Sequence, residues 1–436
     1  MFKTFINAWK IPETRKRIIN TLIFIALFRI GSFIPIPGFK WEVLNQAVQK
    51  SGGLNDLFTL LSFFSGSGRT NNVAIFAMGV LPYINASIIM QLLTVVIPSL
   101  ERLAKEEGEE GRKKMQKYVR WLAIALALLQ GWGLARLFAN QGFIDPGALT
   151  IITTTLVLTA GSMLLIWLGE VFTTIGIGNG VSLVIFIGIV NAFFVGMYQY
   201  ITGAAGDIQM WIKIILATIG GIIVMYFTVY AYLAERRIPI QYAKQVRGRR
   251  VYGGQSTYLP IRLIQAGVLP IIFAMSMLYA PQVILQIIAY AKNNPQWGPL
   301  IGWYKFANSI WYYITMFLLV VGFTYFYNSI TYNPEEIAEN IKKYGGYIPG
   351  IRPGKETAKY IAKVINTLTF PTSIFLGLLA VLPYIIMKYM FSGMTTARLF
   401  FFGGTSLLIV VGVAIETYRQ IEAYIQLRHF KGYLNL

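Results

Sequence analysis

Cysteine is absent from this chain of 436 residues, and histidine occurs only once. The absence of cysteine excludes disulfide bridges, zinc–thiolate sites and iron–sulfur clusters. The one histidine, His429, lies beside Arg428 in the C-terminal tail, where we expect a solvated side chain and not a catalytic one. The usual ligands of a metal centre and the usual bases of a catalyst are therefore scarce.

Nucleotide-binding and metalloprotease motifs are also missing. No Gly-Lys pair is followed by Ser or Thr, and no His-Glu-x-x-His motif occurs. The glycine-rich stretch 176–180, GIGNG, resembles a phosphate-binding loop only loosely, because it lacks the Lys-Ser/Thr that completes such a loop. The sequence predicts no cofactor and no enzymatic activity, so any nucleotide energy must come from a partner.

Charge is the third scarcity. Only 13% of the residues are charged, whereas about a quarter are charged in a typical soluble domain. Hydrophobic residues make up 56% of the chain, and its mean hydropathy is +0.57. This composition predicts a polytopic membrane protein.

Ten apolar stretches are long enough to be transmembrane spans. They cover residues 18–36, 73–97, 119–138, 149–169, 181–201, 211–233, 263–289, 308–330, 364–388 and 399–416. Basic residues before the first stretch imitate a signal peptide, but the stretch is long and no small-residue cleavage site follows it. We interpret it as a retained span, so residues 1–436 form a single all-α domain of ten spans.

The basic residues lie mostly on one side of these spans. Lys and Arg gather at the N-terminus, in the connections after spans two, six and eight, and in the tail. Loops that are rich in Lys and Arg stay in the cytoplasm. Both termini are therefore predicted to be cytoplasmic, which agrees with an even number of spans.

Two of the basic connections, residues about 234–262 and 331–363, are unusually long. Asn333, followed by Pro334 and two glutamates, predicts a helix start, and a turn-rich tip carrying Arg352 follows. The positive-inside rule explains the sign of their charge, but it does not explain long loops with internal order, which are usually functional. We expect docking sites there, and the alternative is a signal for topology alone.

The chain centres on the stretch 51–98. A short apolar piece, 54–64, cannot span a bilayer, and the following run is interrupted at Gly79–Pro82. Span seven carries the same tetrapeptide at Gly267–Pro270. Matching breaks in the two halves of a transporter-like fold point to a pathway, although two ordinary proline kinks are an alternative.

Ionisable residues are scarce inside the spans, where Arg29 is the one clear case. Arg29 is interpreted either as structural or as a residue that reaches a lipid headgroup. A small-molecule secondary transporter normally keeps carboxylates inside the membrane, so this alternative is disfavoured, and a polytopic membrane enzyme is weaker still. An apolar lining that closes by dewetting suits a large and varied cargo better, such as a polypeptide.

Several long motifs resemble the SecY family of protein-conducting channels. They include AMGVLPYINASIIMQLL, WLGEVFTTIGIGNGVSLVIFIGIV, RRIPIQYAKQVRGRRVYGGQSTYLPIRLIQAGVLPIIFA and NPEEIAENIKKYGGYIPGIRPG. The resemblance runs in order from about residue 10 to 430. It implies ten helices in two pseudosymmetric inverted halves, residues 1–205 and 206–436, which form a clamshell around a central pore.

The resemblance also assigns site residues. The apolar pore ring would be Val80, Ile84, Ile185, Ile272 and Ile409. A plug within about 51–70, the segment that diverges most from the family, would include Leu54, Leu57, Phe58, Leu61, Phe63 and Phe64. The lateral gate, through which signal sequences reach lipid, would be faced by Gln91, Gln130 and Pro281.

The remaining expectations concern partners and location. Arg249, Arg250 and Arg352 match the family's docking sites for the ribosome and for the SecA motor ATPase. SecE-like and SecG-like small membrane subunits are implied, with signal sequences and unfolded preproteins as the cargo. The resemblance places the chain in the lipid bilayer of the plasma (inner) membrane.

Overall fold

The computed structural model describes most of the chain, and it divides the chain into two compact units. The described residues are 9–40, 73–105, 107–203, 208–242, 245–247, 250–252, 256–265, 267–291, 299, 302–303, 306, 309–390 and 404–433. Unit 1 comprises Met1–Ile219, Val283–Leu300 and Ile386–Leu436, and unit 2 comprises Gly220–Gln282 and Ile301–Ile385. The plug residues 54–64 and Arg249 lie outside the described residues.

Each of the ten predicted spans corresponds to one helix in the described part of the chain. These helices are α2 (Pro12–Gly31), α5 (Leu81–Val96), α7 (Gly108–Asn140), α8 (Ala148–Ile175), α9 (Gly180–Gly203), α10 (Ile208–Leu233), α11 (Leu269–Ala291), α13 (Ile310–Thr331), α15 (Lys355–Met390) and α16 (Gly404–Tyr433). Among the described residues, five helices are long and apolar enough to cross a membrane, in α7, α8, α10, α13 and α15, and shorter apolar helices lie in α5, α9 and α11.

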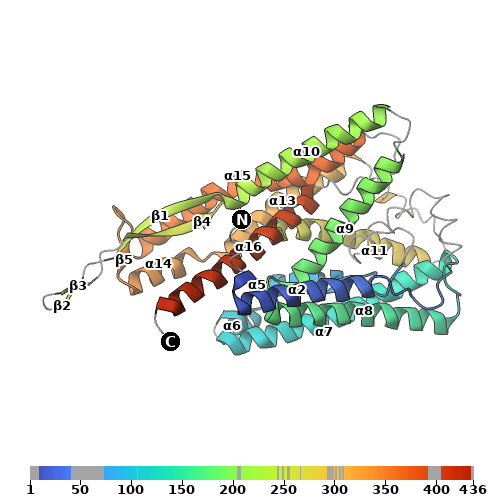
Figure 1. Cartoon of the computed structure of the whole chain (residues 1–436), viewed down its shortest axis with the longest axis horizontal. Helices are drawn as coiled ribbons and strands as arrows, with labels where there is room; N and C mark the ends of the chain where they lie inside the picture. The colour runs from blue at the N-terminus through green and yellow to red at the C-terminus, as the bar shows by residue number, and fades with distance from the viewer. Residues whose placement is uncertain are drawn as a thin grey trace. The chain divides into compact units, whose positions relative to one another are not determined.

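In unit 1, helices α7 and α8 lie side by side, and α5 packs on α7 (Figure 1). Small buried residues recur every four positions along α7, at Ala127, Gly131 and Ala135. This spacing puts them on one helix face, where small side chains allow close approach. A Cβ atom on Gly131 would lie 3.3 Å from the Thr155 carbonyl oxygen of α8.

In unit 2, the two long basic loops form one small domain. Strand β1 (Glu235–Tyr242) pairs antiparallel with β4 (Ser256–Arg262) and with β5 (Gly346–Tyr347), in the order β4-β1-β5. Helix α14 (Pro334–Lys343) and the start of α15 share an apolar core with this sheet, through Ile238, Ile341 and Ile361. The described residues of both loops are ordered, as predicted, but the strands were not predicted.

The predicted helix start at Asn333 is also confirmed. The Asn333 side-chain oxygen accepts hydrogen bonds from the backbone N–H groups of Glu335 (3.2 Å) and Glu336 (3.5 Å). These bonds satisfy donors that have no partner within the helix, and the two carboxylates favour the positive end of the helix dipole.

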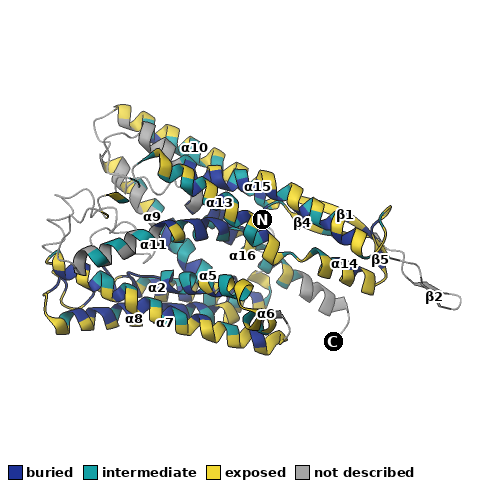
Figure 2. Cartoon of the chain, turned by 180° about the vertical axis from the view of Figure 1, so that it is seen from behind, coloured by how far each residue is buried: buried dark blue, intermediate teal, exposed yellow. Residues whose placement is uncertain are grey.

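Helix α10 has a row of large apolar side chains that are exposed (Figure 2). They recur along the helix as Ile212, Ile215, Ile219, Ile222, Tyr226 and Tyr230. In a membrane protein such a face contacts lipid or a partner helix.

Candidate functional site

Four of the five predicted pore-ring residues belong to one apolar cluster in unit 1. Val80 is completely buried, and Ile84, Ile185 and Ile409 are partly buried and pack against the same cluster. They come from the start of α5, from α9 and from α16, which are far apart in the sequence. The apolar side chains expected at a constriction are therefore brought together within this unit.

The fifth predicted ring residue, Ile272, lies in the first turn of α11 and belongs to unit 2. Its backbone N–H donates to the Val268 carbonyl oxygen at 3.2 Å. In α5, the Ile84 N–H donates to the Val80 carbonyl oxygen at 3.0 Å. The two predicted ring positions therefore occupy matching places in their helices.

The two Gly/Pro motifs share one local conformation. Gly79 and Gly267 have φ angles of +55° and +60°, and each precedes a helix that starts two residues later. Pro82 and Pro270 lie in the first helical turn, where a missing N–H costs nothing. The motifs therefore start helices and are not kinks within them, which excludes the alternative interpretation of two ordinary proline kinks.

Close contacts fix the irregular chain of residues 73–80 that leads into α5. A Cβ atom on Gly161 of α8 would lie 2.2 Å from the Ile75 carbonyl oxygen. A Cβ atom on Gly31 of α2 would lie 2.1 Å from the Phe76 ring. Glycine at both positions therefore allows α2 and α8 to pack closely against the segment that positions Val80.

The predicted lateral-gate residues lie on three helices. Gln91 is exposed on α5, Gln130 is half-buried on α7, and Pro281 lies within α11 of unit 2. Helices α5 and α7 contact each other through an apolar cluster that includes Ala86 and Ala123. Gln91 and Gln130 thus belong to one packed helix pair.

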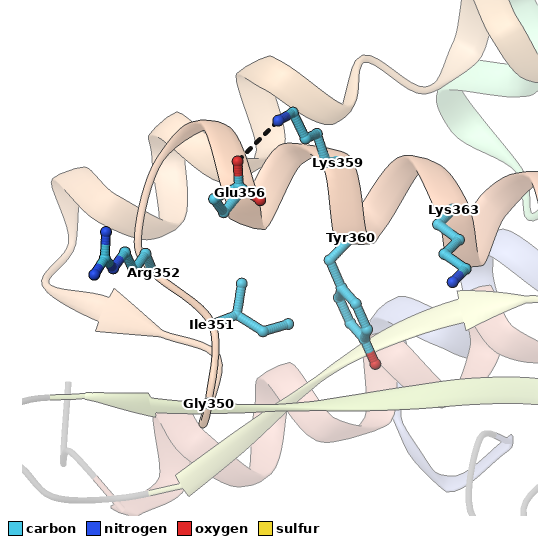
Figure 3. Close-up of a pocket in the computed structure, with 7 residues that line it drawn as sticks. All are labelled: Gly350, Ile351, Arg352, Glu356, Lys359, Tyr360 and Lys363. Atoms are coloured by element: carbon cyan, nitrogen blue, oxygen red, sulfur yellow. Dashed lines mark hydrogen bonds and ion pairs between the residues drawn. The ribbon is translucent and has the colours of Figure 1, made fainter.

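A basic groove of about 440 Å³ lies at the tip that carries Arg352 (Figure 3). It is lined by Gly350, Ile351, Arg352, Glu356, Lys359, Tyr360 and Lys363. The side chain of Arg352 is exposed and extends away from Tyr360. Its backbone carbonyl accepts a hydrogen bond from the buried Thr357 hydroxyl at 2.9 Å. The tip is therefore fixed while its guanidinium stays available to a partner.

Electrostatics within this groove favour anionic ligands. Lys359 donates to Glu356 at 2.9 Å, and this hydrogen bond to a carboxylate raises the pKa of the Lys359 ammonium. Arg352 and Lys363 add two further positive charges to the same lining. The lining thus holds three basic side chains and one carboxylate, so the groove suits phosphate or carboxylate groups.

The second predicted docking point lies on the hairpin of β2 (Gln245–Arg247) and β3 (Arg250–Tyr252). Its register places Arg247 opposite Arg250. Arg250 thus lies at the first position of β3, directly after Arg249 in the sequence. The paired strands β2 and β3 thus lie at either end of this basic stretch.

Two polar contacts between helices were missed or left open at the sequence level. Arg29 of α2 donates to the Asn191 side-chain oxygen of α9, which favours its structural interpretation over the lipid one. Arg120 of α7 makes a two-point ion pair with Glu170 of α8, at 2.9 and 2.8 Å. No spacing rule joins residues this distant in the chain, so only the fold could reveal these pairs.

Comparison with known proteins gives full-length matches. Residues 74–418 match the family model described as SecY. The protein translocase subunit SecY of Streptomyces galbus is 44% identical over 450 residues, and that of Mycobacterium tuberculosis (strain H37Rv) is 41% identical over 449 residues. Both matches cover 100% of this chain and 100% of the relative.

Solved structures share the fold. A protein-conducting channel matches with a TM-score of 0.64 and 22% identity, and the alignment covers 94% of this chain and 92% of that one. A SecY channel, whose plug domain stabilises the closed state and maintains a membrane seal, matches with a TM-score of 0.65, 22% identity and the same coverage. Sec61 from a canine ribosome–channel complex has a TM-score of 0.59 and 21% identity, again with 94% and 92% coverage.

These neighbours have ten helices in two halves, so the predicted ten-span architecture is confirmed. With a family match over most of its length and relatives above 40% identity along the whole chain, this protein belongs to the SecY family.

Proposed function

We propose that the chain is a protein-conducting channel, which moves unfolded polypeptides across the membrane and inserts membrane proteins into it. The observation that carries this proposal is the match along its entire length with relatives named protein translocase subunit SecY. The apolar cluster around Val80, Ile84, Ile185 and Ile409 supports it. Such a lining closes by dewetting and grips no particular side chain of a passing polypeptide.

We further propose a pore ring, a plug and a lateral gate. Ile272 of α11 would complete the ring, and residues 51–70 would form a plug beneath it. A solved neighbour has a plug domain that maintains a membrane seal. Gln91, Gln130 and Pro281 face a lateral gate through which a signal sequence of about 20 apolar residues would partition into lipid.

The proposed docking surface consists of the basic tips of the two long loops, residues about 234–262 and 331–363. Arg249, Arg250 and Arg352 would contact ribosomal RNA phosphates or carboxylates of a SecA-like motor, because a guanidinium binds both groups with two hydrogen bonds. The ribosome is favoured by a neighbour, Sec61, that was solved in a ribosome–channel complex. SecE-like and SecG-like subunits are proposed to cover exposed apolar faces such as that of α10.

The proposed location is the plasma membrane, with both termini in the cytoplasm, where the asymmetry of Lys and Arg places them. The chain itself is proposed to be no enzyme, so a motor or the ribosome supplies the energy. No observation favours the alternative of a small-molecule secondary transporter.

Reconstitution tests the proposal. The chain is placed in proteoliposomes with SecE-like and SecG-like subunits, a SecA motor and ATP, and a radiolabelled secretory precursor is added. We expect the precursor to become protease-protected only when ATP is present. Lack of protection with an active motor would contradict the proposal. Solute uptake driven by a sodium or proton gradient would favour the transporter instead.

A further inference from the structure

The connection between α8 and α9, residues 176–179, is held by side chains from α2. The Arg17 guanidinium donates to the carbonyl oxygens of Thr174 (3.2 Å) and Gly176 (3.0 Å). The Asn20 side-chain amide donates to the Ile175 carbonyl oxygen at 3.1 Å. The last carbonyls of a helix have no partner within it, and a cation there also suits the helix dipole. Helix α2 thus caps the end of α8.

The same connection is held from its other side by α16. The Gly178 backbone N–H donates to the Gln420 side-chain oxygen at 2.8 Å. Gly178 has a φ of +88°, and a Cβ atom there would lie 3.2 Å from the Thr417 hydroxyl. The buried Ile177 packs with Ile421 of α16. Polar and apolar contacts therefore join α16 to the connection.

Arg17 of α2 contacts the end of α8, the connection that follows it, and α16. Besides its two carbonyl acceptors, its guanidinium lies over the Tyr424 ring of α16, 4.8 Å from the ring centre. A cation above an aromatic ring is attracted by the ring's quadrupole. We call the contacts of Arg17, Asn20 and Gln420 with residues 174–178 the clasp.

The clasp also excludes a phosphate site in the glycine-rich loop. A phosphate loop needs backbone N–H groups that are open to the ligand. Here the Ile177 N–H donates to the Thr21 hydroxyl at 3.2 Å, and the Gly178 N–H is taken by Gln420. The Gly180 N–H donates to the Thr173 hydroxyl at 2.9 Å, and the N–H groups of Val181 and Ser182 donate to the Asn179 side chain, which caps α9.

Both helices that leave the clasp lead to the predicted pore ring. Ile185 lies six residues beyond Asn179 on α9, and Ile409 lies eleven residues before Gln420 on α16. At 1.5 Å per residue these distances are about 9 Å and about 17 Å. Ile185 and Ile409 pack together with Ile189. A slide or rotation of α16 against α9 would therefore shift two ring side chains relative to each other.

We propose that Arg17 and Gln420 are positioning residues, which hold α16 in register with α9 and thereby set the seal at Ile185 and Ile409. This inference rests on the proposed channel function for its consequence, but not for its geometry. Neither residue touches the ring itself, and both act through the helices that they join.

Cross-linking tests the register directly, because the chain contains no cysteine of its own. Ile189→Cys and Val410→Cys, whose parent side chains pack together, are combined and treated with a short bis-maleimide reagent in membrane vesicles. In this background Gln420→Ala should slow cross-linking on the order of fivefold, as expected for the loss of one hydrogen bond. Arg17→Ala loses two hydrogen bonds and the contact with the Tyr424 ring, and should slow it at least as much. Glu422→Ala on α16 and Lys16→Ala on α2 are the matched controls and should leave the rate unchanged.

Two further variants separate positioning from general stability. Gln420→Glu keeps an oxygen acceptor for the Gly178 N–H and should restore the rate, whereas Gln420→Met keeps the bulk but offers only a weakly accepting sulfur and should stay slow. Unchanged cross-linking in Gln420→Ala, Gln420→Met and Arg17→Ala would overturn the proposal, as would a slow Gln420→Glu. Because no precursor is present, this result is read independently of whether the chain translocates proteins.

In the intact channel the expected consequence is a leak. Single-channel recordings in planar bilayers should show more frequent openings of the resting channel for Gln420→Met, on the order of fivefold, and wild-type behaviour for Gln420→Glu. A Gln420→Met channel as tight as the wild type, despite slowed cross-linking, would overturn the link to the seal.

Discussion

Gly161 is the point at which α8 comes closest to the irregular chain that leads into α5. Its hydrogen atom faces the Ile75 carbonyl oxygen, where any Cβ atom would lie at 2.2 Å. Backbone lies on both sides of this contact, so no flexible side chain can move away to relieve a clash. Together with Gly31, this position therefore fixes the segment that brings Val80, five residues after Ile75, to the apolar cluster.

We predict that Gly161→Ala destabilises the protein by about 1–3 kcal/mol, the usual cost of overpacking a tight contact. The measurement is the midpoint of thermal unfolding in detergent. Gly220→Ala on α10 is the control, since a Cβ atom there meets no neighbour within 4 Å, and it should not lower the midpoint. Equal midpoints for Gly161→Ala and wild type would show that the helix–loop contact relaxes freely.

Arg352 is the residue on which the proposed docking surface depends most. We predict that Arg352→Glu abolishes import of a precursor into proteoliposomes, because it places a negative charge where phosphate or carboxylate must bind. Insertion of the channel itself should be unaffected, since the side chain is exposed. The assay compares protease-protected precursor at equal amounts of channel.

Lys355→Glu is the control for this change. It makes the same change of charge three residues away, at an exposed position that does not line the groove. Import by this variant should fall much less than import by Arg352→Glu. Equal losses would mean that the overall charge of the tip matters and the groove does not.

At the scale of elements, the starts of α5 and α11 share one local conformation. Each has a glycine with positive φ, two residues before a helix whose first turn holds a proline. A left-handed conformation costs a residue with a side chain roughly 1–2 kcal/mol. Glycine at these two positions is therefore favoured by the backbone conformation.

We accordingly predict that Gly79→Ala and Gly267→Ala each destabilise the protein by about 1–2 kcal/mol and by similar amounts. Thermal unfolding in detergent is again the measurement. Gly322→Ala, within α13 and with no neighbour within 4 Å of the added Cβ, serves as the helical control. A large loss at only one of the two motifs would argue against their equivalence.

Hydrophobic length and proline chemistry were enough to predict most elements. Each predicted span corresponds to a helix, and Asn333 caps α14 as its side chain suggests. The sheet was missed because β1 depends on pairing with β4 and β5, which are distant in the sequence. Ile238 and Ile240 alternate with exposed neighbours, but so short an alternation within a basic loop does not specify a strand until its partners are known.

The site was predicted less completely than the fold. The family motifs identified Val80, Ile84, Ile185 and Ile409, and these residues share one cluster. Physical reasoning alone gave only the Gly/Pro breaks, since many isoleucines in the spans look alike. The clasp could not be predicted, because Arg17 and Gln420 are about 400 positions apart in the sequence and only folding brings both to residues 174–178. The ring, gate and docking roles stay predictions.

At the scale of the whole molecule, the uneven distribution of basic residues predicts a testable orientation. Single cysteines at Lys40 and Lys342, both exposed, would lie on opposite sides of the membrane. An impermeant maleimide should label Lys342→Cys but not Lys40→Cys in inside-out vesicles, and the reverse in intact cells. Labelling of both sites from one side would contradict the predicted topology.

The length of helix α15 exceeds the thickness of the membrane. It runs without interruption for 36 residues from Lys355 to Met390, a length of about 54 Å, whereas the hydrocarbon layer is about 30 Å thick. Its first turns form part of the groove beside Arg352, and its later turns carry the buried Leu376 and Ala380. The helix is therefore long enough to reach from the groove into the membrane as one continuous rod. A partner that tilted its aqueous end would also tilt its transmembrane end without itself entering the bilayer.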